Sequence, residues 1–381
     1  MNPLSSLLES LLKRNRTEYS EDVRKLINSL INEGDLHHGE SWAAHMTPSL
    51  ESPALLGQLL SGLHNGNLLS PELYPQLVKI EKQLIDWFCR LFEHNHAHFT
   101  HGSTYANLEA LWQARELSQA DSTIVYASQD AHYSVAKACH ILGLQFKSIA
   151  TNERGEISIE ALRQACQQQS PLAIIATAGT SSCGAIDAIS SCVALAEQFS
   201  CWCHIDAAWG GALMLTAKSY LLDGLKEADS ISFDPHKALA QPRPCGVLLY
   251  QQPLKSISDI DYLAQAPKQT LLGSHGGEIF LPLWFSLLLS GEQKLAQQIN
   301  HRLLQAKQFY STLKSQTDWW LLSSPTGIVC FRPASHYDLS PLIEQGIFST
   351  VTINDQLSYR AVFASDKTQA KALLAALEIY F

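Results

Sequence analysis

The sequence predicts an α/β fold with a mostly parallel sheet covered by helices. Two observations carry this prediction. Between residues 122 and 251, short apolar runs alternate with segments of helical period, which is typical of strand–helix–strand units. In addition, polar residues such as Thr177, Asp206 and Lys237 stand at or just after the ends of these runs. Ligands in such sheets bind beyond the carboxyl ends of the strands, so one crevice could collect all three.

The elements of this sheet follow one another without a repeat. A helix begins at Gly102-Ser103-Thr104 and extends to about residue 117. Strands are expected at 122–128, 146–149, 172–178, 201–206, 230–234 and 246–251, and helices at 134–142, 158–168 and 188–199.

The flanking regions are predominantly helical. Residues 1–32 predict two helices separated near 14–20, whereas 33–50 has no period. Pro71 suits the first turn of a helix over 71–92, with Ser70 as its N-cap. Another helix is expected at 51–63, a loop-rich passage at 253–275, and a long helical stretch from there to about 314. The remainder predicts strands near 328–332 and 359–363 and helices near 339–345 and 366–379.

These patterns divide the chain into three parts. Residues 1–50 form an N-terminal helical segment that packs on a partner or on the large domain. Residues 51–310 form the large, cofactor-binding domain, and 311–381 form a small C-terminal α+β domain.

Composition limits the class of protein. The chain has 381 residues, is 46% hydrophobic and 17% charged, and carries a net charge of −9, which argues against nucleic acid or anionic membrane as a partner. The longest apolar run, 279–290, contains Pro282 and is shorter than the roughly 18 residues of a membrane span. Nine cysteines without a secretion signal indicate a reducing compartment, so we expect a cytoplasmic protein.

Two strand ends carry the chemistry. Asp206 follows one apolar run, and Asp234-Pro235-His236-Lys237 follows the next. A carboxylate and an amine so placed suit pyridoxal 5′-phosphate, because the lysine can bind it as an imine and the acid can pair with its pyridine nitrogen. Such a charge pair at about 4 Å is worth roughly 4 kcal/mol at an effective dielectric near 20. The alternatives are that Lys237 is a surface lysine after a turn and that Asp206 is an acid that caps a turn.

Further residues suit the rest of that cofactor. Gly102, Ser103 and Thr104 open a helix whose N-terminus favours a phosphate, although they could equally be an ordinary N-cap. His132, between a strand and a helix, could stack on the ring or be a polar loop residue. Thr177 and Thr180 suit contacts near the phenolic oxygen, or simple turn chemistry.

A run of histidines raises the alternative of a metal site. Four histidines, at 94, 96, 98 and 101, alternate over a short stretch. No carboxylate or cysteine stands at ligand spacing beside them, so no metal is predicted.

Together these segments resemble the group II pyridoxal-phosphate-dependent amino-acid decarboxylases, which are fold-type-I enzymes. The matching segments run from about Leu69 to Gly291, in the family's order. They are FTHGSTYANLEALWQAR, DAHYSVAKACHILGL, ATAGTSSCGAID, HIDAAWGGA, DPHK with PCGV after it, and IDYLAQAPKQTLLGSHGG. The resemblance implies an aspartate-aminotransferase-like fold, a mostly parallel seven-stranded sheet, and a homodimer with shared active sites.

The resemblance also implies residue roles. Lys237 is the Schiff-base lysine, Asp206 the partner of the pyridine nitrogen and His132 the ring-stacking residue; these three are the catalytic set. The cofactor-binding set is implied to be Gly102, Ser103, Thr104, His132, Thr180, Asp206, Ala208, Asp234, His236, Lys237 and Ser274. Ser274 matches a region that reaches the partner subunit's phosphate.

The sequence departs from the family in places. Ser103 and Tyr105 replace the usual glycine and glutamate, and His275 replaces a usual arginine. The segment 250–273 is short, like that of the compact histidine, serine and tyrosine/aspartate decarboxylases, which leaves Tyr262 a weak candidate for the proton donor. Arg360 best matches the arginine that binds the substrate's α-carboxylate, with Arg332 as the alternative.

The resemblance therefore implies a lyase that converts an L-amino acid to its amine and carbon dioxide. An aldehyde-lyase or desulfurase on the same fold, or a non-catalytic protein that binds pyridoxal phosphate, are the alternatives. The sequence does not select the amino acid; His45, His64 and His275 are candidates for its side-chain pocket.

Overall fold

The computed structural model describes residues 21–36, 39–118, 122–255, 270–334 and 336–380. The chain forms two compact units, residues 1–39 and residues 40–381. In the first unit the structure describes helix α2 (Glu21–Leu36). The other helix expected in that segment lies outside the described residues, as does Tyr262.

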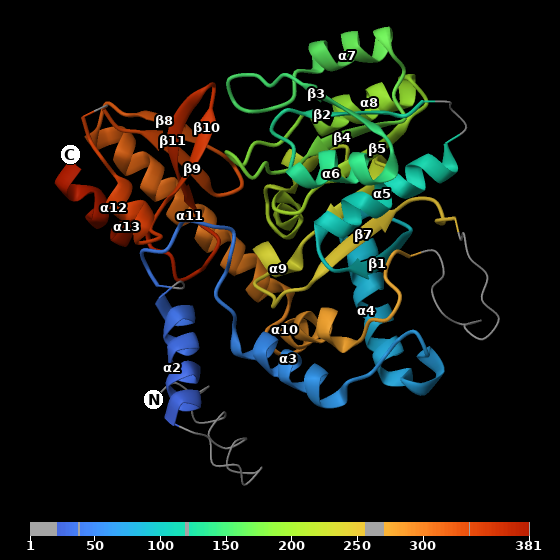
Figure 1. The fold of residues 1–381 in the computed structure, drawn as a ribbon, viewed down its shortest axis with the longest axis horizontal. Helices are drawn as coiled ribbons and strands as arrows, with labels where there is room; N and C mark the ends of the chain where they lie inside the picture. Colours follow the sequence, from blue (N-terminus) through green and yellow to red (C-terminus); the bar gives the residue numbers. More distant parts are fainter. Residues whose placement is uncertain (1–20, 37–38, 119–121, 256–269, 335, 381) are drawn as a thin grey trace. The chain divides into compact units, whose positions relative to one another are not determined.

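In the described part of the second unit, seven strands form one sheet in the order β1-β7-β6-β5-β4-β2-β3 (Figure 1). The strand β7 runs antiparallel to both of its neighbours, and the remaining pairs are parallel, which confirms the predicted mostly parallel sheet. The strands are β1 (His96–Thr100), β2 (Ile124–Ser128), β3 (Gln145–Ile149), β4 (Ala173–Thr177), β5 (Trp202–Asp206), β6 (Ser230–Phe233) and β7 (Gly246–Tyr250).

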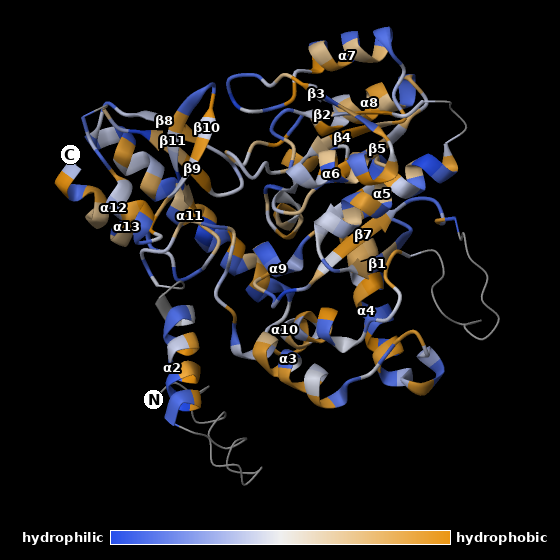
Figure 2. Ribbon diagram, viewed as in Figure 1, coloured by the Kyte–Doolittle hydropathy of each residue, from blue (hydrophilic) through white to orange (hydrophobic). Residues whose placement is uncertain are grey.

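Helices cover both faces of this sheet. Successive residues of one strand belong to different cores: Tyr126 packs in the cluster that holds α4, α7 and α8, whereas Val125 packs with α5 and α6. Strands buried on both sides are nearly continuous apolar runs, as β2 and β4 are up to their last residues, Ser128 and Thr177. Figure 2 shows the corresponding apolar colouring along the central strands. These helices are α4 (Pro75–Phe92), α5 (Ser103–Leu117), α6 (Tyr133–Leu142), α7 (Ile159–Gln168) and α8 (Ile189–Gln198).

One strand was not predicted, and two local predictions were wrong. The unpredicted strand is β1, which lies in the alternating histidine stretch and pairs with β7. The helix expected from Pro71 is a single 3₁₀ turn (Pro71–Leu73), because Pro75 disfavours the helical conformation at the residue before it, and α4 begins only there. The long helical stretch is two helices, α10 (Leu281–Leu289) and α11 (Glu292–Gln316), because Gly291 between them has a positive φ of 80°.

A four-stranded antiparallel sheet follows in the C-terminal region, in the order β10-β11-β9-β8. Two of its strands, β8 and β10, were not predicted. The segment around Ala43 lies against this sheet, since Ala43 accepts a hydrogen bond from Val362 and donates one to Ile347. The elements are β8 (Trp320–Ser323), β9 (Ile328–Arg332), α12 (Ser340–Glu344), β10 (Ser349–Ile353), β11 (Gln356–Val362) and α13 (Ala370–Leu377). The division of the chain into three parts remains a prediction.

No described helix is long and apolar enough to cross a membrane.

The helix α3 (Ser52–His64) packs closely on α10 through Gly57. A Cβ built at Gly57 would lie 2.5 Å from the Cα of Pro282 and 2.6 Å from the carbonyl oxygen of Leu281, both backbone atoms. At Gly62, in the same helix, nothing lies within 4 Å of such a Cβ. The contact therefore requires a glycine at one position of α3 and not at the other.

We expect Gly57→Ala to lower the free energy of unfolding by about 1–3 kcal/mol, because one backbone must move away from the other. The matched change Gly62→Ala should raise it by about 0.5–1 kcal/mol through helix propensity alone. Urea unfolding of both variants checks this, and equal effects at the two positions would contradict the packing described here.

Candidate active site

A cavity with a volume of about 420 Å³ lies beyond the carboxyl ends of strands β4, β5 and β6. Parallel strands end at the same edge of a sheet, which is why residues far apart in the sequence meet there. Its lining residues are His101, Gly102, Ser103, Thr104, His132, Tyr133, Thr177, Gly179, Ser181, Asp206, Ala208, Trp209, Asp234, His236, Lys237, Arg243 and Pro244.

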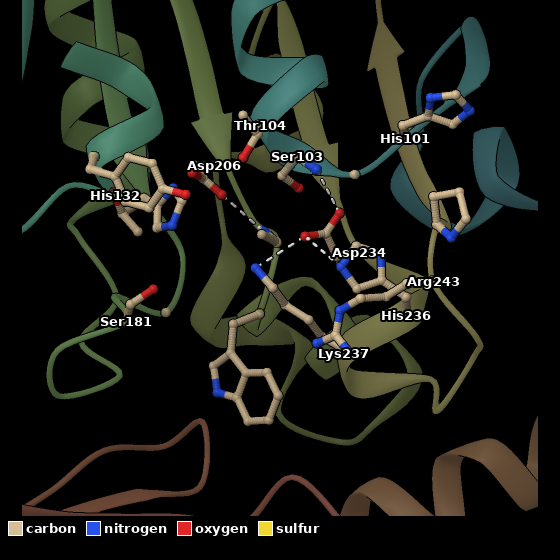
Figure 3. A pocket seen from close by; sticks show the side chains of 17 residues that line it. His101, Ser103, Thr104, His132, Ser181, Asp206, Asp234, His236, Lys237 and Arg243 are labelled. Atoms are coloured by element: carbon tan, nitrogen blue, oxygen red, sulfur yellow. Dashed lines mark hydrogen bonds and ion pairs between the residues drawn. The ribbon is translucent and has the colours of Figure 1, made fainter. Parts of the chain in front are cut away.

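Lys237 enters this cavity from the short helix α9 (Pro235–Ala238), which begins directly after β6. Its Nζ lies 3.0 Å from Oδ2 of Asp234 (Figure 3). Asp234 is buried, and its Oδ1 accepts a hydrogen bond of 2.7 Å from the backbone N–H of Ser103. One carboxylate therefore joins the lysine to the first turn of α5.

Asp206, at the end of β5, is buried and held by two donors. The side-chain amide of Asn107 donates to its Oδ2 at 2.8 Å, and the backbone N–H of Ala208 donates to its Oδ1 at 3.1 Å. Because a carboxylate is costly to bury without partners, these bonds stabilise Asp206 in its buried position. The arrangement presents the carboxylate to the cavity.

Asn107 also reaches the predicted stacking residue, His132. Its amide nitrogen donates to Ser134 Oγ at 3.0 Å, and Ser134 Oγ lies 2.8 Å from Nδ1 of His132. Since the backbone N–H of Ser134 also donates to this Nδ1, the ring nitrogen is an acceptor. Burial lowers the pKa of His132. The imidazole is thus neutral and oriented by the same side chain that holds Asp206.

The carbonyl oxygen of Asn107 accepts two further hydrogen bonds. Ser232 Oγ donates at 2.7 Å and His204 Nε2 donates at 3.0 Å. Behind it, His204 Nδ1 accepts from Ser230 Oγ at 2.8 Å. All four hydrogen-bonding positions of the amide are therefore used, which fixes its orientation. We refer to Asn107, Ser134, His204, Ser230 and Ser232 as the amide network.

The cavity meets the requirements of pyridoxal phosphate on its own geometry. Two lining hydroxyls, Ser103 Oγ and Thr177 Oγ1, are buried without a hydrogen-bond partner, and such groups need an acceptor or donor from a ligand. Gly102 has φ of 107°, and a Cβ there would lie 3.0 Å from Cε1 of His236, so a larger residue would fill the space at the start of α5. These features, with Lys237 and Asp206, fit a phosphate at the helix N-terminus and a ring beyond it.

The structure brings most of the predicted cofactor residues together, with two exceptions. Thr180 is buried and accepts a hydrogen bond of 3.1 Å from Ala185, so its hydroxyl shapes the turn while its neighbours Gly179 and Ser181 line the cavity. Ser274 is exposed and accepts from Asn67 at 3.4 Å, away from this chain's cavity.

Neither candidate arginine for the substrate's α-carboxylate lines the cavity. Arg360 donates to the carbonyl oxygen of Ser181, to Ser349 Oγ at 3.0 Å and to the carbonyl oxygen of Ala44 at 3.2 Å. It therefore lies behind a cavity residue. Arg332 stacks on Trp320, with 3.6 Å between its guanidinium carbon and the ring centroid.

The remaining histidine candidates also lie outside the cavity lining. His275 pairs with Glu81 at 3.0 Å; burial lowers its pKa, but the hydrogen bond and charge of Glu81 raise it overall. His64 packs against Tyr74, and His45 is exposed. Of the alternating histidines, His94 hydrogen-bonds two backbone carbonyls, His96 stacks on Tyr250, His98 pairs with Glu109 and His101 lines the cavity.

Asn107 and its network were not predicted from the sequence. Asn107 follows Ser103 by four residues, so both occupy one face of α5. That face is otherwise apolar and buried. A single amide on a buried apolar stripe was the signal available.

The fold and this cavity define an enzyme of the fold-type-I, pyridoxal-phosphate-dependent class. Residues 10–334 match the pyridoxal-dependent decarboxylase conserved domain. The chain belongs to the pyridoxal-dependent decarboxylase family. Membership indicates pyridoxal phosphate as the cofactor and amino-acid decarboxylation as the type of reaction.

Individual relatives agree with this assignment. Aspartate 1-decarboxylase of Aliivibrio fischeri is 26% identical over 373 residues, which are 83% of this chain and 68% of that protein. L-2,4-Diaminobutyrate decarboxylase of Rhizobium meliloti is 34% identical over 235 residues, which are 57% of this chain and 48% of that protein. The chain thus spans 68% of the first of these relatives and 48% of the second. The structure of Catharanthus roseus tryptophan decarboxylase with L-tryptophan superposes with a TM-score of 0.83 at 22% identity, covering 96% of this chain and 90% of that chain.

We expect Asn107→Ala to weaken the affinity for pyridoxal phosphate about 10-fold and to lower the free energy of unfolding by about 1–3 kcal/mol, because four buried partners lose a hydrogen bond. Titration of the apoprotein with cofactor and urea unfolding measure the two effects. The control Asn300→Ala removes an exposed amide from α11 and should change neither. Unchanged cofactor affinity in Asn107→Ala would contradict the role given to the network.

His204 makes stability depend on pH. Burial lowers its pKa from 6.5 to about 4, so protonation favours the unfolded chain. Its contribution is complete above pH 6.5 and is lost as the pH falls toward 4, by about 3 kcal/mol in total. We therefore expect His204→Asn to be less stable than the wild type at pH 7.5 and to lose less stability between pH 6.5 and pH 4.5.

Chemical denaturation across this pH range measures the difference. His140→Asn, on the exposed side of α6, is the matched control and should follow the wild type. Parallel curves for the wild type and His204→Asn would show that the imidazole is not buried in its neutral form.

Proposed function

We propose that the chain decarboxylates an L-amino acid with pyridoxal phosphate bound at Lys237. The observation that carries the proposal is the convergence of Lys237, Asp206 and two unpartnered buried hydroxyls on one cavity. Family membership supports the reaction type. Bound there, pyridoxal phosphate supplies an electron-withdrawing ring that accepts the electron pair released when the bond to the α-carboxylate breaks.

The residues of this chain have distinct parts in that reaction. Lys237 Nζ would hold the cofactor covalently, and Asp234, 3.0 Å away, orients the amine. Asp206 would pair with the ring nitrogen, because the amide network holds its carboxylate in place. Positioning groups of this kind act most strongly in a site closed to water, and Asp206 is only 4% exposed.

The other lining residues would bind the cofactor. Ser103 and Thr104 would hold the phosphate at the start of α5, near His236, whose Nδ1–H donates to the carbonyl oxygen of Cys245 at 2.6 Å. His132 and Ala208 would contact the ring. Gly102 would allow the close approach, and we retain Thr180 and Ser274 as proposed contacts.

We also propose a homodimer with shared active sites. The surface of α3 and α10 supports this, since Leu63 is 77% exposed and Leu288 and Leu289 are 58% and 59% exposed. An apolar surface of this kind is usually covered by another subunit. Ser274 would then reach the partner's phosphate, and Arg360 remains our proposal for the α-carboxylate ligand.

A cytoplasmic location is part of the proposal. All nine cysteines are free thiols, and burial raises the pKa of several of them, including Cys139 and Cys166 to about 11. Unpaired thiols of this number are typical of a reducing compartment.

We expect Lys237→Ala to abolish carbon dioxide release from every amino acid tested, and to abolish borohydride fixation of the cofactor. The purified chain is assayed for carbon dioxide and amine with each of the twenty amino acids. Lys226→Ala, an exposed lysine near β6, is the control and should retain both activities. An aldehyde or sulfur product in place of carbon dioxide from the wild type would overturn the proposed reaction.

A further inference from the structure

The cavity contains an unequal set of charges. Its acids are Asp206 and Asp234, and both are engaged by described neighbours. Asp206 accepts from Asn107 and Ala208, and Asp234 binds Ser103 and Lys237 and lies 3.5 Å from His236 Nε2. No lining carboxylate is left for a second cation.

Lys237 is the first cation of the cavity, and Arg243 is the second. It is exposed at the cavity, and none of the described carboxylates pairs with it; its hydrogen bond is one of 3.4 Å to Thr47 Oγ1. Arg243 and Lys237 line the same cavity, and Figure 3 shows Arg243 close to the lysine-bearing turn. A guanidinium has five donors in a planar fork that matches a carboxylate, and most of these donors have no partner among the described residues.

The phosphate of the cofactor is not the anion that Arg243 suits best. Figure 3 shows Ser103 and Thr104 on one side of Asp234, and Arg243 with the stem of Lys237 on the other side. The helix N-terminus and the unpartnered Ser103 hydroxyl already serve a phosphate on their side. Arg243 lies on the other side of Asp234, beside the amine-bearing side chain of Lys237.

We propose that Arg243 binds a carboxylate on the side chain of the substrate, so that the enzyme acts on acidic L-amino acids. This inference rests on the proposed decarboxylation at Lys237.

The side-chain carboxylate fits this role better than the α-carboxylate. The α-carboxylate is the group for which Arg360 is proposed above, and it loses its charge as it leaves as carbon dioxide. A side-chain carboxylate keeps its charge throughout the reaction. An arginine that binds it therefore lowers KM and positions the substrate without opposing bond cleavage.

The test compares acidic substrates with their neutral amides. For the wild-type chain loaded with cofactor, we expect kcat/KM for L-aspartate or L-glutamate to exceed that for L-asparagine or L-glutamine. In Arg243→Gln, kcat/KM for the acid should fall about 10- to 100-fold, mainly through KM, as expected for loss of a hydrogen bond to a charged group. Arg243→Lys should recover part of the loss, since it keeps the charge without the fork.

A binding measurement complements the kinetics. Isothermal titration of the holoenzyme with succinate, a dicarboxylate that has no amine to react, should show binding to the wild type that Arg243→Gln weakens to the level of the monoamide succinamate. Arg154→Gln, an exposed arginine outside the cavity lining, is the matched control and should leave binding and kinetics unchanged.

Three outcomes would overturn the inference. One is a wild type that prefers aromatic or basic amino acids. Another is an Arg243→Gln variant that treats acidic substrates as the wild type does. The third is a variant whose affinity for pyridoxal phosphate falls 10-fold, because Arg243 would then bind the phosphate. Each of these leaves decarboxylation intact, whereas a wild type that releases carbon dioxide from no amino acid would refute the proposed function itself.

Discussion

The site depends on one buried carboxylate being held in place. Asp206 lies at the buried end of β5, where a carboxylate without partners would be costly. The side-chain amide of Asn107 and the backbone N–H of Ala208 stabilise it by donating to both of its oxygens. Asn107 can do so only because Ser232 and His204 fix its orientation from the opposite side. A group that never contacts a ligand thus sets the electrostatics of the cavity.

The topology of the sheet explains why these groups meet. Strands β5 and β6 are parallel neighbours, so Asp206 and the turn that carries Lys237 leave the sheet at the same edge. Helix α5 crosses behind this edge, and its first two turns supply both Ser103 and Asn107. One helix therefore provides the N-terminus suited to a phosphate and the amide that holds the ring partner. A shift of α5 would disturb both ends of the cofactor site together.

The sequence predicted the residues whose role follows from a strand end or a helix start. Lys237, Asp206, His132 and Ser103 belong to this group, because alternation of apolar runs and helices locates such ends to within a few residues. It did not predict Asn107 or His204, since a buried amide or imidazole acquires its role only from partners on other elements. In one turn the sequence predicted Thr180 as the contact, whereas Gly179 and Ser181 line the cavity. The reason is that sequence does not give the direction of a side chain in a turn. Arg243 was missed for the same reason.

We expect Asp206, held in place by the amide network, to pair with the ring nitrogen of the bound cofactor. The most direct measurement of this pairing is the ¹⁵N chemical shift of pyridoxal phosphate labelled at that nitrogen and bound to the chain, recorded between pH 6 and pH 8.5. We expect a protonated nitrogen across this range, and loss of that state in Asp206→Ala. An unprotonated nitrogen in the wild type at pH 8, or an identical shift in Asp206→Ala, would contradict the pairing.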